Sequence, residues 1–236
     1  MSVRARNALR KFEFVLDVPG SAAGNVMVHS GDTCVLCTAS IASEVPGWLR
    51  DQKPPRGWVT AEYNMLPGST IERKRRGTDG RGSEIQRLIA RVLRQSVDLE
   101  KMPGLLITCD CDVIRADGGT RTASINGAFV ALALALSAAR ERGLISENPI
   151  VHEVAAISVG IVEGEVVLDL DYALDSRAQV DLNVAMTGEL ELVEIQGTGE
   201  TAHFSRAQLD EMLDVATDGI RQIVQTQRSV LSARFS

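Results

Sequence analysis

The residues from Cys109 to Ala123, CDCDVIRADGGTRTA, join an apolar strand to a helix through a Gly-Gly-Thr-Arg turn. Gly118 and Gly119 let the backbone approach a ligand closely, because neither residue carries a Cβ atom. Thr120 is expected to cap the helix and offer a hydroxyl, while Arg121 supplies a planar guanidinium suited to phosphate. Because a helix N-terminus also favours anions, the turn predicts an oxyanion site; the alternative is an ordinary strand-to-helix turn with a surface arginine.

Carboxylates gather further along the chain. Four of them lie within thirteen residues, beginning at the end of a predicted strand: Asp169, Asp171, Asp175 and Asp181. A fully extended strand would hold Asp175 and Asp181 about 20 Å apart at about 3.3 Å per residue, so their cooperation requires a bend at residues 176–178. With that bend, both carboxylates can hold one Mg²⁺, or one can bind the metal while the other donates a proton. The alternative is a solvated acidic loop.

Charge is distributed unevenly along the 236 residues. The formal net charge of −6 excludes a generally basic nucleic-acid coat. Residues 72–94 are the exception, because they hold eight Lys or Arg residues against three acidic ones. Any polyanion must therefore be bound by a local patch.

The cysteines and one uncharged run bear on metal binding and location. Cys34 with Cys37 and Cys109 with Cys111 lie in apolar, strand-like runs without glycine-containing knuckles, which favours buried free thiols over a zinc site. Residues 123–139 carry no charge, but the run is short and contains polar residues, so it predicts a core helix rather than a membrane span. The N-terminus shows no signal peptide and free thiols fit a reducing cytosol, so we expect a cytoplasmic protein without a membrane partner.

The first half of the chain predicts strands followed by two helices. Its first sixty residues alternate apolar and polar positions between Gly, Pro and Asp clusters, which indicates antiparallel strands. Ser83 is expected to cap a helix with Gln86 as its capping-box partner. A strand over residues 105–114 then leads through the Gly-Gly-Thr-Arg turn into a helix that ends near Gly143.

The second half repeats this order. A hairpin that turns at Glu163-Gly164, two further strands and an amphipathic helix from about Ser205 follow one another. Blocks of strands followed by helices predict an α+β architecture. We expect a single domain over residues 1–236, with an internal seam near residues 145–150.

Several long motifs, in one order over nearly the whole chain, resemble the ribonuclease PH family of phosphate-dependent 3′-to-5′ exoribonucleases. They are GWVTAEYNMLP (57–67), GRGSEIQRLIARVLR (80–94), DCDVIRADGGTRTASINGA (110–128), DSRAQVDLNVAMTG (175–188) and VEIQGTGE (193–200). The resemblance implies a ribonuclease PH-like α+β fold of βαβα type. It also implies a ring-shaped homo-hexamer, built as a trimer of dimers, with Mg²⁺ at the active site and inorganic phosphate as co-substrate.

The resemblance assigns roles to residues of this chain. It implies a phosphate-binding set made of Arg81, Gly119, Thr120 and Arg121. It implies that Asp175 and Asp181 bind magnesium and serve catalysis, with Asp181 favoured as the acid that protonates the departing 3′ oxygen. Arg73 and Arg76 match basic loop positions that bind RNA across a subunit boundary. The loop between Pro67 and the phosphate-binding set is several residues shorter than the family pattern.

The resemblance therefore implies a tRNA nucleotidyltransferase with the following reaction. Phosphate attacks the last phosphodiester of a single-stranded RNA 3′ end, a nucleoside diphosphate leaves, and precursors of tRNA and other RNAs are trimmed. One alternative is a non-catalytic RNA-binding ring subunit of an exosome-like assembly, which the loss of Arg121 or of either carboxylate would favour. Another is a zinc-stabilised binding protein.

Overall fold

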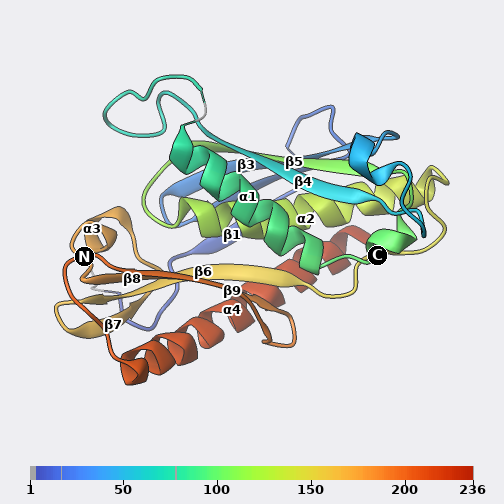
Figure 1. Ribbon diagram of the computed structural model, residues 1–236. Helices are drawn as coiled ribbons and strands as arrows, with labels where there is room; N and C mark the ends of the chain where they lie inside the picture. The colour runs from blue at the N-terminus through green and yellow to red at the C-terminus, as the bar shows by residue number, and fades with distance from the viewer. Residues whose placement is uncertain (1–3, 17, 78, 236) are drawn as a thin grey trace.

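Two β-sheets alternate with two helical layers in the computed structural model, which describes residues 4–16, 18–77 and 79–235 (Figure 1). The first sheet contains β1 (Phe12–Val15), β2 (Gly24–Ser30), β3 (Thr33–Ala42), β4 (Trp58–Met65) and β5 (Leu106–Arg115) in the order β1-β2-β3-β5-β4. The second contains β6 (Val154–Val162), β7 (Glu165–Leu168), β8 (Val180–Thr187) and β9 (Leu192–Gly199) in the order β7-β6-β8-β9.

Helices complete the layers. Helices α1 (Gly80–Gln95) and α2 (Thr120–Glu141) pack between the two sheets. Helix α4 (Arg206–Phe235) covers the outer face of the second sheet (Figure 1). Short helical segments are η1 (Gly47–Leu49), η2 (Leu99–Lys101) and α3 (Tyr172–Asp175). The order sheet, helices, sheet, helix confirms the predicted α+β class and its βαβα layering.

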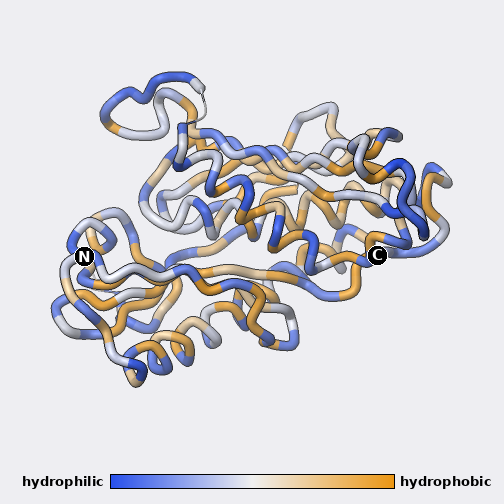
Figure 2. The backbone as a smooth tube through the Cα atoms, viewed as in Figure 1, coloured by the Kyte–Doolittle hydropathy of each residue, from blue (hydrophilic) through white to orange (hydrophobic). Residues whose placement is uncertain are grey.

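Helix α2 forms the centre of the core. By length and composition it could cross a membrane, but 83% of its apolar window is buried inside the fold, as expected of a core helix. Glycine at position 127 lets it approach the first sheet, because a Cβ there would lie 2.6 Å from the Cys37 sulfur. Figure 2 shows hydrophobic chain through the inner layers and hydrophilic chain in the loop that leads into α1.

One buried amide joins the two halves of the molecule. Asn126 on α2 donates from Nδ2 to the carbonyl oxygen of Ala156 at 2.9 Å and accepts from the same residue's N–H at 2.7 Å. Because Ala156 lies on β6, the pair fixes α2 against the second sheet. This joint sets the distance between the N-terminus of α2 and the strands that carry the carboxylates.

Three of the four cysteines are buried, as the apolar runs predicted, and none of the four forms a disulfide. Cys37, Cys109 and Cys111 are buried beneath α2, and Cys34 is half-buried. Burial raises the pKa of the Cys37 and Cys109 thiols well above the ordinary value, so they remain protonated at neutral pH.

Two local predictions were wrong. Strand β4 runs parallel to β5, from the pair Trp58–Leu106 onward, because the crossover through α1 brings the chain back in the same direction. Helix α1 begins at Gly80 rather than near Ser83, because Asp79 caps it by accepting the Gly82 N–H at 2.7 Å. Aspartate is as good a cap as serine, and the glycines do not prevent an earlier start.

Candidate active site

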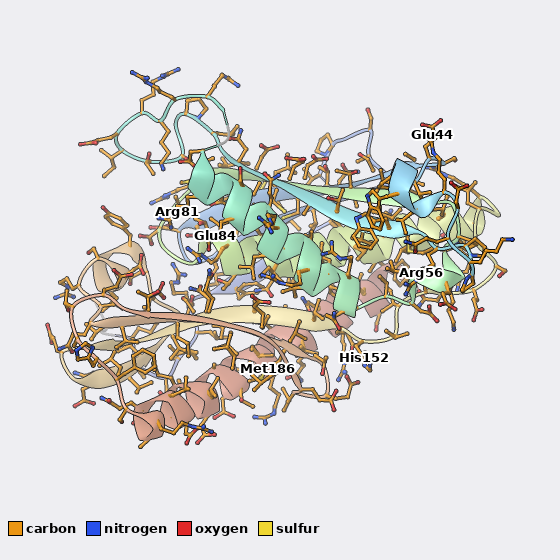
Figure 3. All side chains as sticks on the ribbon, in the orientation of Figure 1. Glu44, Arg56, Arg81, Glu84, His152 and Met186 are labelled. Carbon is orange, nitrogen blue, oxygen red and sulfur yellow. The ribbon has the colours of Figure 1, made fainter. Side chains whose placement is uncertain are left out.

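The predicted site residues converge at one end of the molecule, on the left in Figure 1. There the N-termini of α1 and α2, helix α3, the start of β8 and the end of β9 lie close together. Figure 3 labels Arg81 and Glu84 on the α1 side of this region. The site thus draws on both halves of the chain.

The turn before α2 adopts a backbone that requires glycine. Gly118 and Gly119 have φ values of 73° and 63°, in the left-handed region. A Cβ at Gly118 would also lie 2.5 Å from the Leu170 carbonyl oxygen. Gly119 is the N-cap and Thr120 the first helical residue, so the prediction that Thr120 caps the helix was wrong. Its hydroxyl, and the first N–H groups of the helix, remain available to other partners.

A buried tyrosine holds the Thr120 hydroxyl. The Tyr63 hydroxyl lies 2.9 Å from Thr120 Oγ1, and the tyrosine ring is buried at the end of β4. Burial raises the pKa of Tyr63, although Thr120 and the nearby charges of Arg81 and Arg121 oppose the shift. Tyr63 therefore stays protonated at neutral pH and can donate to Thr120, which leaves the Thr120 proton free for an anion.

Arg121 is positioned by residues from the opposite side of the site. Its Nη1 donates to Oε1 of Gln196 on β9 at 2.6 Å and lies 4.0 Å from the Glu84 carboxylate on α1. Gln196 in turn donates to Glu84. The Arg121 side chain is only 17% exposed. A guanidinium has five N–H donors, so a fixed arginine with one used donor can still bind phosphate with the others.

The chain bends between Asp175 and Asp181, the two predicted carboxylates, and this bend brings them near enough for their charges to interact. Helix α3 ends at Asp175, and the Ala178 N–H donates back to the Asp175 carbonyl at 3.1 Å before β8 begins at Val180. Burial raises the pKa of both Asp175 and Asp181, and the charge of Asp175 raises that of Asp181 further. Arg121 opposes both shifts, which places it close enough to act on the two carboxylates.

These interactions define what we call the Arg–Asp cluster, made of Arg81, Arg121, Asp175 and Asp181. The charge of Arg81 acts on Asp175 and on Tyr63, so α1 contributes its first turn to the same site. The cluster combines two cations with two carboxylates whose protons are held more tightly than usual. Such an arrangement can bind an anion and supply a proton beside it.

The basic loop, residues 66–77, projects from the body of the protein beside the cluster (Figure 1). Arg73 and Arg76 are both exposed on it. Arg76 lines a pocket of about 310 Å³ together with Tyr63 and Arg81, so the loop borders the side of the site that these two residues form. Arg73 is exposed on the same loop and is not among the residues that line this pocket.

A buried ion pair supports the glycine turn from behind. Arg10 Nη2 lies 2.7 Å from Asp169 Oδ1, and both side chains are more than nine-tenths buried. Arg10 Nη1 also donates to the Asp117 carbonyl oxygen at 2.6 Å, just before the turn. Arg4 donates to the Asp169 carbonyl oxygen at 2.9 Å. The N-terminal segment thus fixes the backbone that leads into Gly118.

Sequence reasoning missed several polar residues of the site. They are Tyr63, Glu84, Gln196 and Glu200, of which Glu200 acts electrostatically on both carboxylates. All four lie within the motifs quoted above, which is the signal that could have found them. Their partners lie on distant parts of the chain, so their roles emerge only from the fold.

The donor set fits a magnesium ion that the substrate helps to bind. Mg²⁺ in phosphoryl-transfer sites is held by one or two carboxylates plus substrate phosphates. Asp175 and Asp181 supply two such carboxylates, and the repulsion that raises the pKa of Asp181 would be relieved by a cation between them. Within the described residues, no group of three or more His, Cys, Asp or Glu side chains is arranged to hold a metal ion.

Known families and relatives match the chain over most of its length. The model described as "3′ exoribonuclease family, domain 1" matches residues 8–137, and that of domain 2 matches residues 152–219. A ribonuclease PH from Corynebacterium glutamicum is 51% identical over 233 residues, which cover 97% of this chain and 94% of the relative. A ribonuclease PH from Crocosphaera subtropica is 50% identical over 232 residues, with 97% and 96% covered.

Solved structures match the fold. The Archaeoglobus fulgidus exosome with RNA bound to the active site contains a chain with a TM-score of 0.82 and 23% identity, covering 94% of this chain and 90% of that one. Rice (Oryza sativa) Rrp46 has a TM-score of 0.77 and 20% identity, with 97% and 98% covered. At such identities the likeness concerns the fold alone.

Proposed function

Because the chain belongs to the 3′ exoribonuclease family, we propose that its Arg–Asp cluster performs the phosphorolysis of RNA 3′ ends. With about half of its residues identical to ribonuclease PH over nearly its full length, the chain is a phosphate-dependent 3′-to-5′ exoribonuclease that acts in tRNA processing. The observation that carries the assignment to these residues is the convergence of two arginines and two carboxylates from four separate segments.

Inorganic phosphate binds at the N-terminus of α2 in this proposal. Arg81 and Arg121 supply charge-assisted donors, and Thr120 donates its hydroxyl proton while it accepts one from Tyr63. Gly119 permits the close approach of the anion and directs the first N–H groups of α2 towards it. Two fixed cations are needed because the attacking phosphate and the RNA phosphodiester are both anionic.

In the reaction, a phosphate oxygen attacks the phosphorus of the last phosphodiester. The bond from that phosphorus to the 3′ oxygen of the preceding nucleotide breaks, and the terminal nucleotide leaves as its diphosphate. The departing 3′ oxygen then takes a proton. Asp181 is the favoured proton donor of the pair, because burial and also the charge of Asp175 raise its pKa, so that it holds a proton more readily than an ordinary aspartate.

Magnesium is the cofactor that these residues would hold. Asp175 and Asp181 provide the protein ligands, and the ion supplies positive charge beside the reacting phosphates when it is bound. The proton donation assigned to Asp181 is a property of the chain itself, as is the binding of phosphate by the arginines.

The basic loop binds the body of the RNA. Arg73 and Arg76 are exposed beside the pocket, where their charges can reach the RNA backbone. We further propose a homo-hexameric ring, a trimer of dimers in which this loop reaches the site of an adjacent subunit; the ring-forming exosome proteins with the same fold support it. Four free thiols support a cytoplasmic location.

The products of the reaction test this proposal. A tRNA with extra 3′ nucleotides is incubated with magnesium, with and without inorganic phosphate, and the released nucleotides are identified by mass. Nucleoside diphosphates that require phosphate are expected. Monophosphates released without phosphate would contradict phosphorolysis. RNA binding without any release would instead favour the non-catalytic ring subunit, against which the complete cluster argues.

A further inference from the structure

An aromatic surface lies at the end of the molecule opposite the Arg–Asp cluster. It contains Trp48 and Trp58, the two tryptophans of the whole chain. Their rings meet edge to face, with centroids 4.9 Å apart and an interplanar angle of 86°. Segment η1 buries Leu49 and turns Trp48 outward, so that Trp48 is 59% exposed. A large indole so exposed is unusual in a soluble protein.

An arginine fixes the inner tryptophan. The Arg94 guanidinium carbon lies 4.5 Å from the centroid of the Trp58 ring, and Arg94 Nη1 donates to the Val59 carbonyl oxygen at 3.0 Å. Trp58 is thereby held between a cation and the second indole. Trp48 packs edge to face against Trp58 and is itself exposed to solvent.

Exposed cations lie close to the outer tryptophan in the sequence. Arg50, Lys53 and Arg56 follow it within eight residues, with Asp51 as the one acid among residues 50–56. Arg56 lies 4.0 Å from Glu100, a loose and exposed pair that leaves its charge accessible. We call Trp48 and these three cations the Trp patch.

The Trp patch is separate from the active site. Trp58 and Tyr63 are five residues apart on β4, or about 17 Å at about 3.3 Å per residue. Arg81 and Arg94 are thirteen residues apart on α1, or about 20 Å at 1.5 Å per residue. Figure 3 shows Arg56 and Arg81 at opposite ends of the molecule. No residue of the patch belongs to the site described above.

We propose that the Trp patch is a second RNA-binding surface, on which a base of a single-stranded RNA segment stacks against Trp48. An exposed aromatic ring flanked by flexible cations is the combination by which proteins bind single strands without reading their sequence. Arg50, Lys53 and Arg56 contact the backbone phosphates on either side of the stacked base. The proposal rests on RNA being the substrate of the enzyme.

A second copy of the chain fits the same surface less well. The centres of protein–protein interfaces are depleted in charged side chains other than arginine, whereas this exposed segment also contains Lys53 and Asp51. A duplex is also disfavoured, because its bases are already stacked on one another.

Intrinsic fluorescence tests the proposal directly, because both tryptophans lie at this surface. Oligoadenylate is titrated into the intact protein without inorganic phosphate, so that no phosphorolysis occurs. Quenching that saturates with RNA is expected. Polyphosphate, which carries charge but no bases, is the matched ligand, and it should quench far less. Equal quenching by polyphosphate would overturn the stacking contact.

Two substitutions separate stacking from folding. Trp48→Ala should weaken binding of a labelled oligoadenylate by about fivefold or more, whereas Trp48→Phe, which keeps an aromatic face, should stay within about twofold of the wild type. Phe235→Ala removes an exposed aromatic side chain elsewhere and should leave binding unchanged. Unchanged affinity in Trp48→Ala would overturn the proposal.

The remaining outcomes are also decisive. Loss of the ring in Trp48→Ala, measured by light scattering, would assign the surface to a contact between copies of the chain and overturn the RNA contact. Phosphorolysis of a short oligonucleotide, followed in parallel, reports on the active site alone. If that activity persists while the tryptophans fail to respond to RNA, the inference fails and the proposed function stands.

Discussion

Arg121 and Arg73 carry the same guanidinium in very different surroundings. Arg121 is 17% exposed and bonded to Gln196, whereas Arg73 is exposed on the basic loop. A fixed arginine offers its donors in one direction and loses little side-chain entropy when an anion binds. An exposed arginine contributes mainly charge, which salt screens. The comparison supports the proposal that the chain uses different arginines to recognise a small anion and to attract a polymer.

Asp181→Asn should have the greatest effect on turnover, because it removes the proposed proton donor from the Arg–Asp cluster. We expect turnover to fall by a factor of about 10² to 10⁴, the usual contribution of a general acid. RNA affinity and the assembly state should be retained. Single-turnover kinetics and light scattering measure the two. Normal turnover in this variant would remove Asp181 from catalysis.

Arg121→Ala tests the anion-binding role of the fixed arginine. It should raise the KM for phosphate by about 10- to 100-fold, the value of one charge-assisted hydrogen bond to an anion, while the Kd for RNA changes little. Initial rates at varied phosphate and RNA binding by anisotropy provide the two numbers. A parallel loss of RNA affinity would contradict the proposal that Arg121 binds phosphate while the basic loop binds RNA.

The double substitution Arg73→Ala, Arg76→Ala tests the role of the basic loop in RNA binding. It should weaken tRNA binding and lower the slope of log K against log salt by about 1.4, as expected for two lost phosphate contacts to a single strand. The KM for phosphate should stay near the wild-type value. Arg115→Ala, which removes an exposed arginine outside the basic loop, is the matched control. If it flattened the salt dependence equally, the loop would have no special role.

Tyr63→Phe tests whether the Tyr63 hydroxyl contributes to phosphate binding through Thr120. The ring stays buried and only the hydrogen bond to Thr120 is lost, so the KM for phosphate should rise about two- to tenfold. Thr120→Val should largely absorb this effect, because Tyr63 acts through Thr120. A double-mutant cycle measures the coupling. Additive effects of the two substitutions would show that Tyr63 acts independently.

The smallest effect concerns stability and pH. The pKa of Asp181 is raised in the folded protein, so its protonated form favours folding. Its contribution is therefore present below the unfolded pKa of about 3.9 and is lost as the pH rises through the folded pKa. Asp181→Asn, neutral throughout, should have a higher Tm than the wild type at neutral pH, and the difference should close towards pH 4. A difference independent of pH would contradict this origin.

The sequence predicted most of the fold because periodicity and turn chemistry are local. The Glu163-Gly164 hairpin, the buried α2 and the helix from about Ser205 all follow from patterns within each segment. The parallel pairing of β4 with β5 could not be read in this way, because it depends on how α1 returns the chain. The start of α1 was misplaced because two capping residues, Asp79 and Ser83, compete within one turn.

The candidate site shows the same difference between residues that local sequence motifs reveal and residues whose partners are distant in the sequence. Motifs identified Arg81, Arg121 and the two carboxylates, whose roles stay predictions until they are measured. Gln196 lies within a quoted motif, but nothing near it in the sequence indicates that it bonds to Arg121, 75 residues away. The buried pair of Arg10 and Asp169 was missed for the same reason, since its partners are 159 residues apart.

The central claim is that fixed arginines hold a phosphate that becomes part of the product. Labelled inorganic phosphate, supplied with a 3′-extended tRNA and magnesium, tests it most directly. The label should appear in the β-phosphate of the released nucleoside diphosphates with the wild type, and at the same low phosphate concentration the rate of incorporation should fall steeply in Arg121→Ala. Nucleotides released without label, or equal labelling by the variant, would contradict the account.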